Sequence, residues 1–533
     1  MKKLPIGIQS IKKVLSNNEY VYVDKTGFVK QLIDAGSPHY FLSRPRRFGK
    51  SLFINTLEEV LSGNKELFKG LQIYKSDYSW EKFPVVHLDF SKIANRTAEQ
   101  LEKAIKNRLK LIANKNNVSI ITDDVEVALD TLITGLSEKT DSQVVVLIDE
   151  YDKPIIDRLD SLETAQKNKD ILKGFFGTLK ALDDHLKLTF ITGISKFSHV
   201  SLFSGLNNLN DITMDSEYAE IMGYTEEEVR CAFSDHVQSI ANERHKTSVT
   251  SVLEEVKNWY NGYRFSKSSV CVYNPFSTLN FMNKKHLGGY WYSTGTPSFL
   301  IDELKKHSKS MISLDGATAR EDELTDISSL EEIDLKALMY QTGYFTIKDY
   351  NSISNRYHLG LPNEEVRTAF MNSLVKNFTS NFDVKSSEKF VKALENHQLN
   401  ILFEEIKIGF ASFSYQVFAG AKEKTYQAMI LSMLYGMGFE PLSERSTNIG
   451  RIDVVLEMQK STYIIELKLD KNSKAALDQI RKNGYFMPYL RKGKEIVIVG
   501  ANFSSEKRNV SEWEGEILSE DGNFLRKIGL EKS

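Results

Sequence analysis

Four short apolar runs in the first 200 residues each end in polar residues. They cover residues 39–45, 83–91, 143–152 and 186–195. Apolar residues recur at helical spacing between them, over 51–63, 98–113 and 164–185. Unbroken apolar runs are typical of strands buried on both faces, and strands that alternate with helices form parallel sheets. The pattern predicts an α/β domain over residues 1–222, in which helices flank a parallel sheet and the polar strand ends lie together.

The pattern becomes mainly helical after residue 222, and we assign residues 223–320 to a helical lid. Two helices are expected over 224–243 and 250–265, each opened by a threonine cap with an acidic first turn. The stretch 337–375 then indicates a helix, two short strands and a helix that starts after Pro362. This order is compatible with a winged helix.

We assign residues 321–410 to this winged-helix-like segment and a helical linker, and residues 411–533 to a last domain. The last domain combines α and β elements. A helix is expected over 423–435, followed by two strands, a helix over 473–485 and a strand over 495–499. The whole chain is therefore expected to be of the α/β class.

The bulk composition limits the classes of protein to consider. A length of 533 residues exceeds what one core organises, so several domains are expected. No apolar window long enough for a membrane span occurs, and no secretion signal is visible at the N-terminus. Cys231 and Cys271 are too few for a disulfide scaffold, which favours the reducing cytoplasm. A net charge of -2 means that nucleic acid must be bound through local patches.

The sequence SRPRRFGKSLF lies where the first strand meets the following helix, and backbone N–H groups at such a junction attract phosphate. Gly49, Lys50 and Ser51 match the end of the GxxxxGK[ST] motif. In that motif the glycine lets the backbone approach, the lysine reaches the β- and γ-phosphates, and the serine binds Mg²⁺. Arg44 replaces the first glycine, so a chance GKS at a helix start is the alternative.

A second acidic element lies one βαβ unit further along the chain. The apolar strand 143–152 carries Asp149 and Glu150, as a Walker B strand does. Asp149 would hold Mg²⁺ through Ser51 and water, and Glu150 would activate the attacking water. The alternative is a strand end that only caps the next helix, but the two motifs occur together and in the right order. The expected nucleotide-binding residues are Arg47, Phe48, Gly49, Lys50, Ser51, Leu52 and Asp149.

Other polar residues near the predicted strand ends are weaker candidates. Thr192 and Ser195 end the fourth strand, where a sensor of the γ-phosphate would lie. Lys196, Arg230 or Arg264 would supply the charge that stabilises phosphoryl transfer. For each of these three cations, a solvated surface group is the simpler interpretation.

The last domain places two acids and a lysine on successive strands. Residues two apart on a strand share a face, so Glu466 and Lys468 lie together, and Asp453 faces away from Val454 and Leu456 on the preceding strand. Asp453 and Glu466 offer hard oxygen ligands for Mg²⁺, with Mn²⁺ as a second candidate, and Lys468 would orient the attacking water. The predicted chemistry is phosphodiester hydrolysis. The alternative is an ordinary charged face of a half-solvated strand.

The helix, strand, strand, helix order around these residues is that of the PD-(D/E)XK nuclease core. Gln479 and Tyr485 on the following helix are expected to face the same cleft. Glu423 is either an additional acid of the site or a helix-dipole partner, the second being slightly favoured. A basic cluster forms either a phosphate-contacting surface or a solvated helix face; it comprises Lys471, Lys474, Arg481, Lys482, Arg491, Lys492 and Lys494.

Several stretches spread over nearly the whole chain resemble a bacterial family of AAA-ATPase-like proteins with a C-terminal PD-(D/E)XK nuclease domain. They are PIGIQ, YVDKTGFVKQL, FLSRPRRFGKSLF, LIDEYDKP, ITGISKFSHVSLFSGLNNLNDIT, WYNGYRF with VYNPFS, YQTGYFTI, GLPNEEVR and GRIDVVLE followed by YIIELKL. Arginine at the first glycine of the loop is characteristic of that family. The resemblance implies a P-loop NTPase fold, a restriction-endonuclease-like fold, an ATP site and a metal site; their residues are Lys50, Ser51, Asp149, Glu150, Asp453, Glu466 and Lys468.

Two functions compete at this point. The first is an ATP-regulated nuclease that cuts nucleic acid, with DNA as the expected substrate and defence or mobile-element biology as the expected setting. The second is a nucleotide-dependent switch that binds nucleic acid or a partner without cutting, and the intact acid, acid and lysine set argues against it. No helicase signature supports translocation along DNA, and a homo-oligomer remains open.

Overall fold

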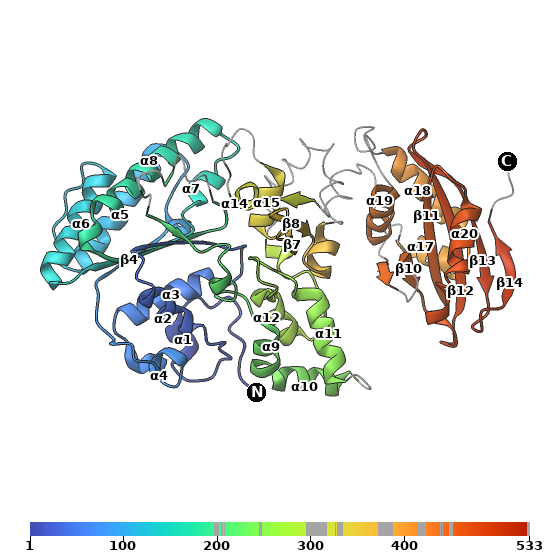
Figure 1. Ribbon diagram of the computed structural model, residues 1–533, viewed down its shortest axis with the longest axis horizontal. Coiled ribbons are helices and arrows are strands. Elements are labelled where there is room, and N and C mark those ends of the chain that lie inside the picture. Colours follow the sequence, from blue (N-terminus) through green and yellow to red (C-terminus); the bar gives the residue numbers. More distant parts are fainter. Residues whose placement is uncertain are drawn as a thin grey trace. The chain divides into compact units, whose positions relative to one another are not determined.

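The computed structural model divides into two compact units (Figure 1). The first comprises Met1–Glu303 with Leu314–Val366, and the second comprises Leu304–Ser313 with Arg367–Ser533. The structure describes residues 1–196, 202–203, 206, 208–244, 248–294, 317–325, 327, 334–370, 387–412, 423–436, 439, 441–446 and 451–529. Among the helices in these ranges, none has both the length and the apolar character required to cross a bilayer.

A five-stranded sheet of order β2-β3-β4-β1-β5 is the centre of the first unit, and its neighbouring strands run parallel. The predicted α/β class and the four predicted strands are confirmed. The central strands are buried because helices cover both faces of the sheet. The strands are β1 (His39–Ser43), β2 (Val85–Asp89), β3 (Val144–Asp149), β4 (Leu186–Gly193) and β5 (Asn210–Asp211).

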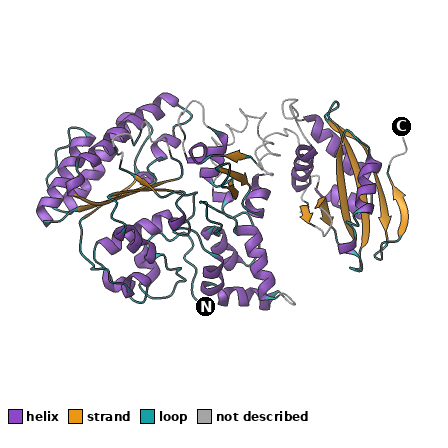
Figure 2. Cartoon of the chain, in the orientation of Figure 1, coloured by secondary structure: helices purple, strands orange, loops and turns teal. Residues whose placement is uncertain are grey.

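Two groups of helices flank this sheet (Figures 1 and 2). One group contains α1 (Ile11–Leu15), α2 (Thr26–Asp34), α3 (Lys50–Leu61) and α4 (Gln72–Lys75). The other contains α5 (Ala98–Lys115), α6 (Val125–Thr140), α7 (Lys153–Ile156) and α8 (Leu162–Ala181). The side chains of Thr97 and Asp124 cap α5 and α6 by accepting backbone N–H groups, which fixes where these helices begin. Helix α6 was not among the predicted helices.

Within its described residues, the predicted lid contains the helices α9 (Glu226–Ala232), α10 (Ser234–Glu243), α11 (Val249–Tyr260) and α12 (Pro275–Lys284). Thr225 and Glu228 form a capping box at α9, so the first predicted cap is confirmed. The second is wrong, because α11 begins one residue earlier than Thr250, its cap is the extended residue Ser248, and its first turn holds no acid. The single helix predicted over 224–243 is broken at the buried residue Phe233, whose backbone is not helical.

The following segment contains a three-stranded antiparallel sheet of order β6-β8-β7. Among the described residues, two helices lie between its first two strands in the sequence, and residues 364–370 are helical after its last strand. This is the element order of a winged helix. The elements are β6 (Thr318–Ala319), α14 (Glu321–Thr325), α15 (Leu335–Thr342), β7 (Thr346–Asn351) and β8 (Arg356–Gly360).

The second unit is built on a six-stranded sheet of order β14-β13-β12-β11-β10-β9, in which β11 and β12 are parallel and the other pairs antiparallel. One core packs one face of the sheet against α17 to α19, and a second core packs the other face against α20. Its helices are α17 (Ser387–Glu395), α18 (Leu399–Ser412), α19 (Glu423–Gly436) and α20 (Ser473–Lys482). Its strands are β9 (Leu442–Ser446), β10 (Arg451–Glu457), β11 (Ser461–Leu469), β12 (Glu495–Ser504), β13 (Asn509–Leu518) and β14 (Phe524–Ile528).

Candidate nucleotide and metal sites

The loop between β1 and α3 has the backbone of an anion site. Arg47 has φ of +66° and Gly49 has φ of +96°, and no atom lies within 4 Å of where a Gly49 Cβ would be. Glycine is thus required there by conformation and not by lack of space. Within the described residues, the N–H groups of Arg47, Phe48, Gly49 and Lys50 donate no hydrogen bond. Four unpaired donors at the start of a 12-residue helix favour a bound anion.

Lys50 lies under this loop, where it contacts the loop carbonyls. Its ammonium donates to the carbonyl oxygens of Arg44, at 2.9 Å, and Pro45, at 3.0 Å. Burial lowers the pKa of Lys50, while the nearby carboxylates of Glu150 and Asp149 oppose the shift. The lysine is therefore held in place within reach of a ligand on the loop.

A cavity of about 360 Å³ opens beside the loop and is lined by both polar and apolar residues. Its polar side is formed by the loop, with Lys50, Ser51, Leu52 and Glu150. Its apolar side is formed by the N-terminal PIGIQ segment, β-branched residues near the start of the chain and helix α12; among these residues are Pro5, Ile8, Val21, Val23, Phe276 and Leu279. A phosphate end and an apolar end suit a nucleotide, and the Arg47 guanidinium lies 5.0 Å from the Phe276 ring between them.

Asp149 and Ser51 are brought together at the end of β3. Burial raises the pKa of Asp149, and the hydroxyl of Ser51 opposes the shift by hydrogen bonding. Asp149 Oδ1 is buried without a hydrogen-bond partner among the described residues. A buried carboxylate oxygen without a donor, next to a serine hydroxyl, fits the oxygen ligands that Mg²⁺ prefers. Glu150 follows at φ of +51°, and its side chain lines the cavity.

Arg44, at the position of the missing glycine, anchors the loop. Its guanidinium is 1% exposed and donates to the carbonyl oxygens of Ser43 (2.9 Å), Thr213 (2.7 Å) and Tyr218 (3.3 Å). The guanidinium also lies 4.2 Å from the centre of the Phe265 ring. Burial lowers the pKa of Arg44 to about 10, so the group is still charged at neutral pH. Arg44 thus ties the start of the loop to the backbone at Thr213 and Tyr218.

Not every predicted nucleotide-site residue points into the cavity. The Phe48 ring is 1% exposed and packs on Tyr263 and Phe265, so only its backbone faces the site. Thr192 donates its hydroxyl to the Leu42 carbonyl at 2.7 Å, which ties β4 to β1. The Ser195 hydroxyl is buried and has no hydrogen-bond partner within the described chain.

Asp152 is a residue that the sequence analysis missed. It is fully buried and accepts the N–H groups of Ile194, at 2.9 Å, and Ser195, at 2.7 Å. Burial raises its pKa to about 6. Asp152 thereby joins the ends of β3 and β4 beside the nucleotide site. The only signal in the sequence is a third acid in the LIDEYD stretch.

The three cations considered for phosphoryl transfer have other partners. Lys196 is buried and pairs with Asp211, and Arg264 is buried and donates to the carbonyls of Ser266, Lys267 and Lys348. Neither is the solvated surface group considered above. Arg230 does lie on the surface, where it pairs with Glu226 one turn away on α9.

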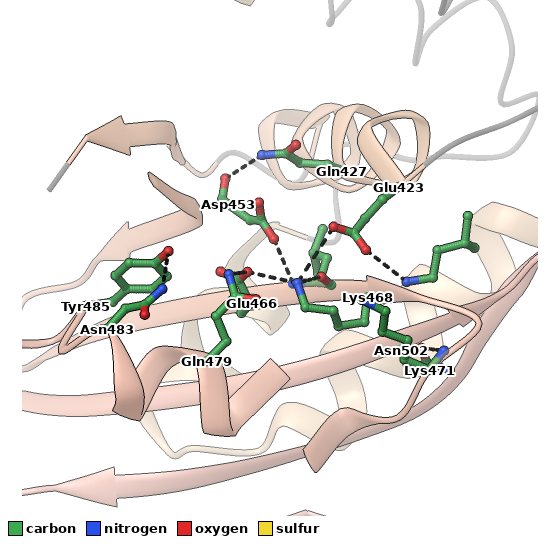
Figure 3. Close-up of polar contacts among 12 residues, drawn as sticks. Glu423, Gln427, Asp453, Glu466, Lys468, Lys471, Gln479, Asn483, Tyr485 and Asn502 are labelled. Atoms are coloured by element: carbon green, nitrogen blue, oxygen red, sulfur yellow. Dashed lines mark hydrogen bonds and ion pairs between the residues drawn. The ribbon is translucent and has the colours of Figure 1, made fainter. Parts of the chain in front are cut away.

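The acids and the lysine of the last domain converge on the face of the sheet covered by α20 (Figure 3). Val454 on β10 pairs with Ile465 on β11, so the next antiparallel step sets Asp453 opposite Glu466. Asp453 Oδ2 accepts the Leu467 N–H at 2.9 Å. The expected alternation therefore holds along β11 and most of β10. Ile452, which the same alternation predicts on the side of Val454 and Leu456, instead joins the core under α20, so the prediction is wrong at this residue.

Glu466 and Lys468 form a buried ion pair. Their side chains are 2% and 8% exposed, and Lys468 Nζ lies 3.0 Å from Glu466 Oε1. Burial raises the pKa of Glu466 to about 7, and the charge of Asp453 adds to the shift. Burial alone would lower the pKa of Lys468, but the surrounding carboxylates raise it. The ammonium also donates to the Leu467 carbonyl at 2.8 Å.

Glu423 at the start of α19 belongs to the same cluster. Its Oε1 lies 3.7 Å from Lys468 Nζ, and its Oε2 accepts the Leu469 N–H at 3.2 Å. This contact favours the first of the two roles considered for Glu423. Gln427, one turn further along α19, donates to the Asp453 carbonyl at 3.0 Å and was not identified from the sequence.

The cluster fits a hard divalent ion that is shared with water and substrate. Among the described residues, no group of three or more His, Cys, Asp or Glu side chains is gathered as a metal cage. Mg²⁺ does not need one, since it is commonly held by one or two carboxylates with waters and phosphate oxygens. Glu466 Oε2 is buried and has no hydrogen-bond partner in the described parts of the chain, which leaves one carboxylate oxygen for such an ion.

Gln479 and Tyr485 are both expected to face the acids and the lysine, but only Gln479 does so. Gln479 on α20 donates its amide to Glu466 Oε1 and so belongs to the site. Tyr485 lies beyond the end of α20 at Lys482, and its buried hydroxyl accepts the Asn483 amide at 2.9 Å. Tyr485 therefore packs in the core beside α20 instead of facing the acids and the lysine.

The basic cluster near α20 is partly neutralised by an acidic row on β13. Ser473 at the start of α20 donates its N–H to Glu512 and its hydroxyl to Glu514. Arg481, one of the basic residues, pairs with Glu516 on the same strand. The face of α20 that lies against β13 is therefore paired with carboxylates and does not present free cations.

Comparisons with known proteins find relatives of both domains. Residues 5–203 match a family described as a predicted AAA-ATPase, and residues 421–513 match the PD-(D/E)XK nuclease superfamily. Domains of these kinds generally use a nucleotide and a divalent metal. A relative from Azotobacter chroococcum mcd 1, described as an uncharacterized protein in the vnfD 5' region, is 35% identical over 523 residues. The match covers 96% of this chain and 98% of that protein. The chain belongs to the family of AAA-ATPase-like proteins that carry a PD-(D/E)XK nuclease superfamily domain at the C-terminus.

Proposed function

We propose that this protein binds and hydrolyses ATP and that its C-terminal domain cleaves nucleic acid, with DNA as the substrate, under nucleotide control. The observation that carries the nuclease part is the convergence of Asp453, Glu466 and Lys468 on one face of the sheet, with Glu466 and Lys468 buried. A domain that only binds nucleic acid gains nothing from burying an acid and a lysine beside a second acid, because desolvating charges is costly. The proposed setting is the cytoplasm, in defence or mobile-element biology.

In the nucleotide site, each residue has a distinct proposed role. The free N–H groups from Arg47 to Lys50 hold the phosphates, and Lys50 offsets their charge. Ser51 and Asp149 hold Mg²⁺, which when bound neutralises charge on the phosphates. Glu150 orients the attacking water from the cavity wall.

In the nuclease site, Asp453 and Glu466 hold Mg²⁺ or Mn²⁺, which when bound polarises the scissile phosphate. Lys468 positions a water for attack and offsets developing charge. Glu423 and Glu466 both contact the ammonium of this lysine and hold it in place. Gln479 fixes the Glu466 carboxylate through its amide.

The test is to incubate the full chain with DNA or RNA in Mg²⁺ or Mn²⁺, with and without ATP. Glu466→Ala should abolish cleavage and leave ATP hydrolysis intact, while the matched control Glu457→Ala, an exposed acid of β10, should cut as the wild type does. Lys50→Ala should abolish ATP hydrolysis and nucleotide control, while Lys69→Ala, an exposed lysine, should change neither.

Three results would contradict the proposal in different ways. A wild type that hydrolyses ATP but cuts no nucleic acid leaves only a nucleotide-dependent binding protein. A Lys50→Ala variant that cuts with the same response to ATP as the wild type refutes the coupling. Cleavage of RNA alone refutes the assignment of DNA.

A further inference from the structure

Residues far from the phosphate loop in sequence pack directly against it. The Trp291 indole N–H donates to the Arg46 carbonyl oxygen at 3.0 Å. Gly343, at the end of α15, approaches so closely that a Cβ there would lie 2.7 Å from the Pro45 Cβ. Its φ of +88° also requires glycine. The loop is thus contacted by the lid and by the winged-helix-like segment.

Helix α15 has the place in this segment that the groove-reading helix has in winged-helix proteins. A groove-reading helix must be exposed to contact base edges. Every residue of α15 except Lys336 is buried instead. Its Gln341 accepts the Lys196 N–H at 3.0 Å just beyond β4 and donates to the Leu324 carbonyl at 2.8 Å. The helix therefore packs against the end of β4 in the five-stranded sheet. Its buried side chains leave no surface that could contact the bases of DNA.

The Trp291 hydrogen bond sets the direction of a phosphate-binding donor. A trans peptide is planar, so the carbonyl of one residue and the N–H of the next point in opposite directions. Holding the Arg46 carbonyl toward Trp291 therefore turns the Arg47 N–H away from Trp291. Within the described residues, that N–H is one of the four unpaired donors of the loop.

Trp291 is in turn held by a buried acid. Its backbone N–H donates to Glu365 Oε1 at 2.7 Å, and the Glu365 side chain is 0% exposed. Glu365 lies in the GLPNEEVR stretch, one residue before Val366, where the first unit ends. Two consecutive hydrogen bonds thus lead from the phosphate loop to the end of the first unit.

We propose that Trp291 and Glu365 are positioning residues of the nucleotide site, which hold the phosphate loop in its anion-binding shape. The inference rests on the proposed binding of ATP and adds residues outside the segment that matches the ATPase family. Without the Trp291 donor the Arg46 peptide is free to rotate, and one phosphate donor is lost. Without the Glu365 acceptor, the backbone of Trp291 is no longer held, and its indole N–H no longer points at the Arg46 carbonyl.

The experiment measures the affinity of the full chain for ATP and for inorganic tripolyphosphate by calorimetry. Trp291→Phe keeps an aromatic ring and removes the indole N–H. It should lower the affinity for both ligands by tenfold or more, because the defect lies where the phosphates bind. Trp259→Phe makes the same change on α11, away from the loop, and should stay within twofold of the wild type.

Conservative and disruptive variants separate positioning from folding. Glu365→Gln keeps an acceptor and should bind ATP within about threefold of the wild type, whereas Glu365→Leu should lose as much affinity as Trp291→Phe. If Trp291→Phe binds both ligands as tightly as Trp259→Phe, or if Glu365→Gln and Glu365→Leu are equal, the inference is wrong. If the wild type binds neither ligand, the proposed ATP function fails and this inference with it.

Discussion

Restoring the motif glycine by Arg44→Gly should damage the protein, although it recreates the sequence GxxxxGKS. The substitution removes a buried guanidinium and leaves the carbonyls of Thr213 and Tyr218 without donors. It also removes the contact with Phe265. We therefore expect the first unit to lose stability and ATP affinity together.

The magnitude follows from the contacts. Two tertiary hydrogen bonds from a charged donor contribute roughly 2 to 3 kcal/mol each, and the ring contact about 2 kcal/mol when desolvated. The substitution also removes the cost of burying the Arg44 charge, which lowers the pKa of Arg44 to about 10. This gain offsets about 3 kcal/mol of the loss. Glycine adds about 1 kcal/mol of backbone entropy cost. The net expected loss in free energy of unfolding is about 4 to 6 kcal/mol.

Urea unfolding of the full chain, followed with and without ATP, measures this loss. Arg47→Gly is the matched control, because Arg47 is exposed and has a positive φ that glycine adopts without strain. We expect it to be neutral or slightly stabilising. An Arg44→Gly protein as stable as Arg47→Gly, with unchanged or tighter ATP binding, would refute the anchoring role.

Three further changes test other contacts. Gly500→Ala should destabilise the second unit by about 3 kcal/mol and abolish cleavage, since its Cβ would lie 2.2 Å from a carbonyl oxygen of α20; unfolding and nuclease assays check this. The buried Glu365 carboxyl has its pKa raised to about 7 from 4.5, so its contribution to stability is present below pH 4.5 and is lost as pH rises to about 7. The stability of Glu365→Gln relative to the wild type should therefore rise by on the order of 3 kcal/mol across that window and then level off; a flat difference between pH 5 and 8 would contradict this. Lys25→Met should cost about 2 kcal/mol in urea unfolding, since it leaves Glu228 without its ammonium partner, and Lys69→Met should cost nothing measurable.

The sequence predicts the elements whose pattern is local. Unbroken apolar runs identify β1, β3 and β4 of the first sheet, because such strands are buried on both faces. Alternation along residues 461–469 is enough to place Glu466 and Lys468 on one face of a strand. Strand β13 escapes notice because its glutamates and glycine interrupt the apolar pattern.

Contacts between distant segments could not be predicted in this way. Arg44 and Arg264 both donate to backbone carbonyls, which every residue offers and no sequence pattern reveals. Trp291 lies 245 residues from Arg46, so no local spacing connects the two. Burial of Lys196 depends on Asp211 and on the fold around β4, whereas its own neighbours in sequence are compatible with a surface position.

The acidic row of β13 also restricts how a polyanion approaches the second unit. The start of a helix normally offers positive potential to a phosphate. At α20 that potential is already met by Glu512 and Glu514, and Arg481 is matched by Glu516. A nucleic-acid backbone entering from this side would meet like charge at short range. The acidic row therefore disfavours the approach of the proposed substrate along this side of α20.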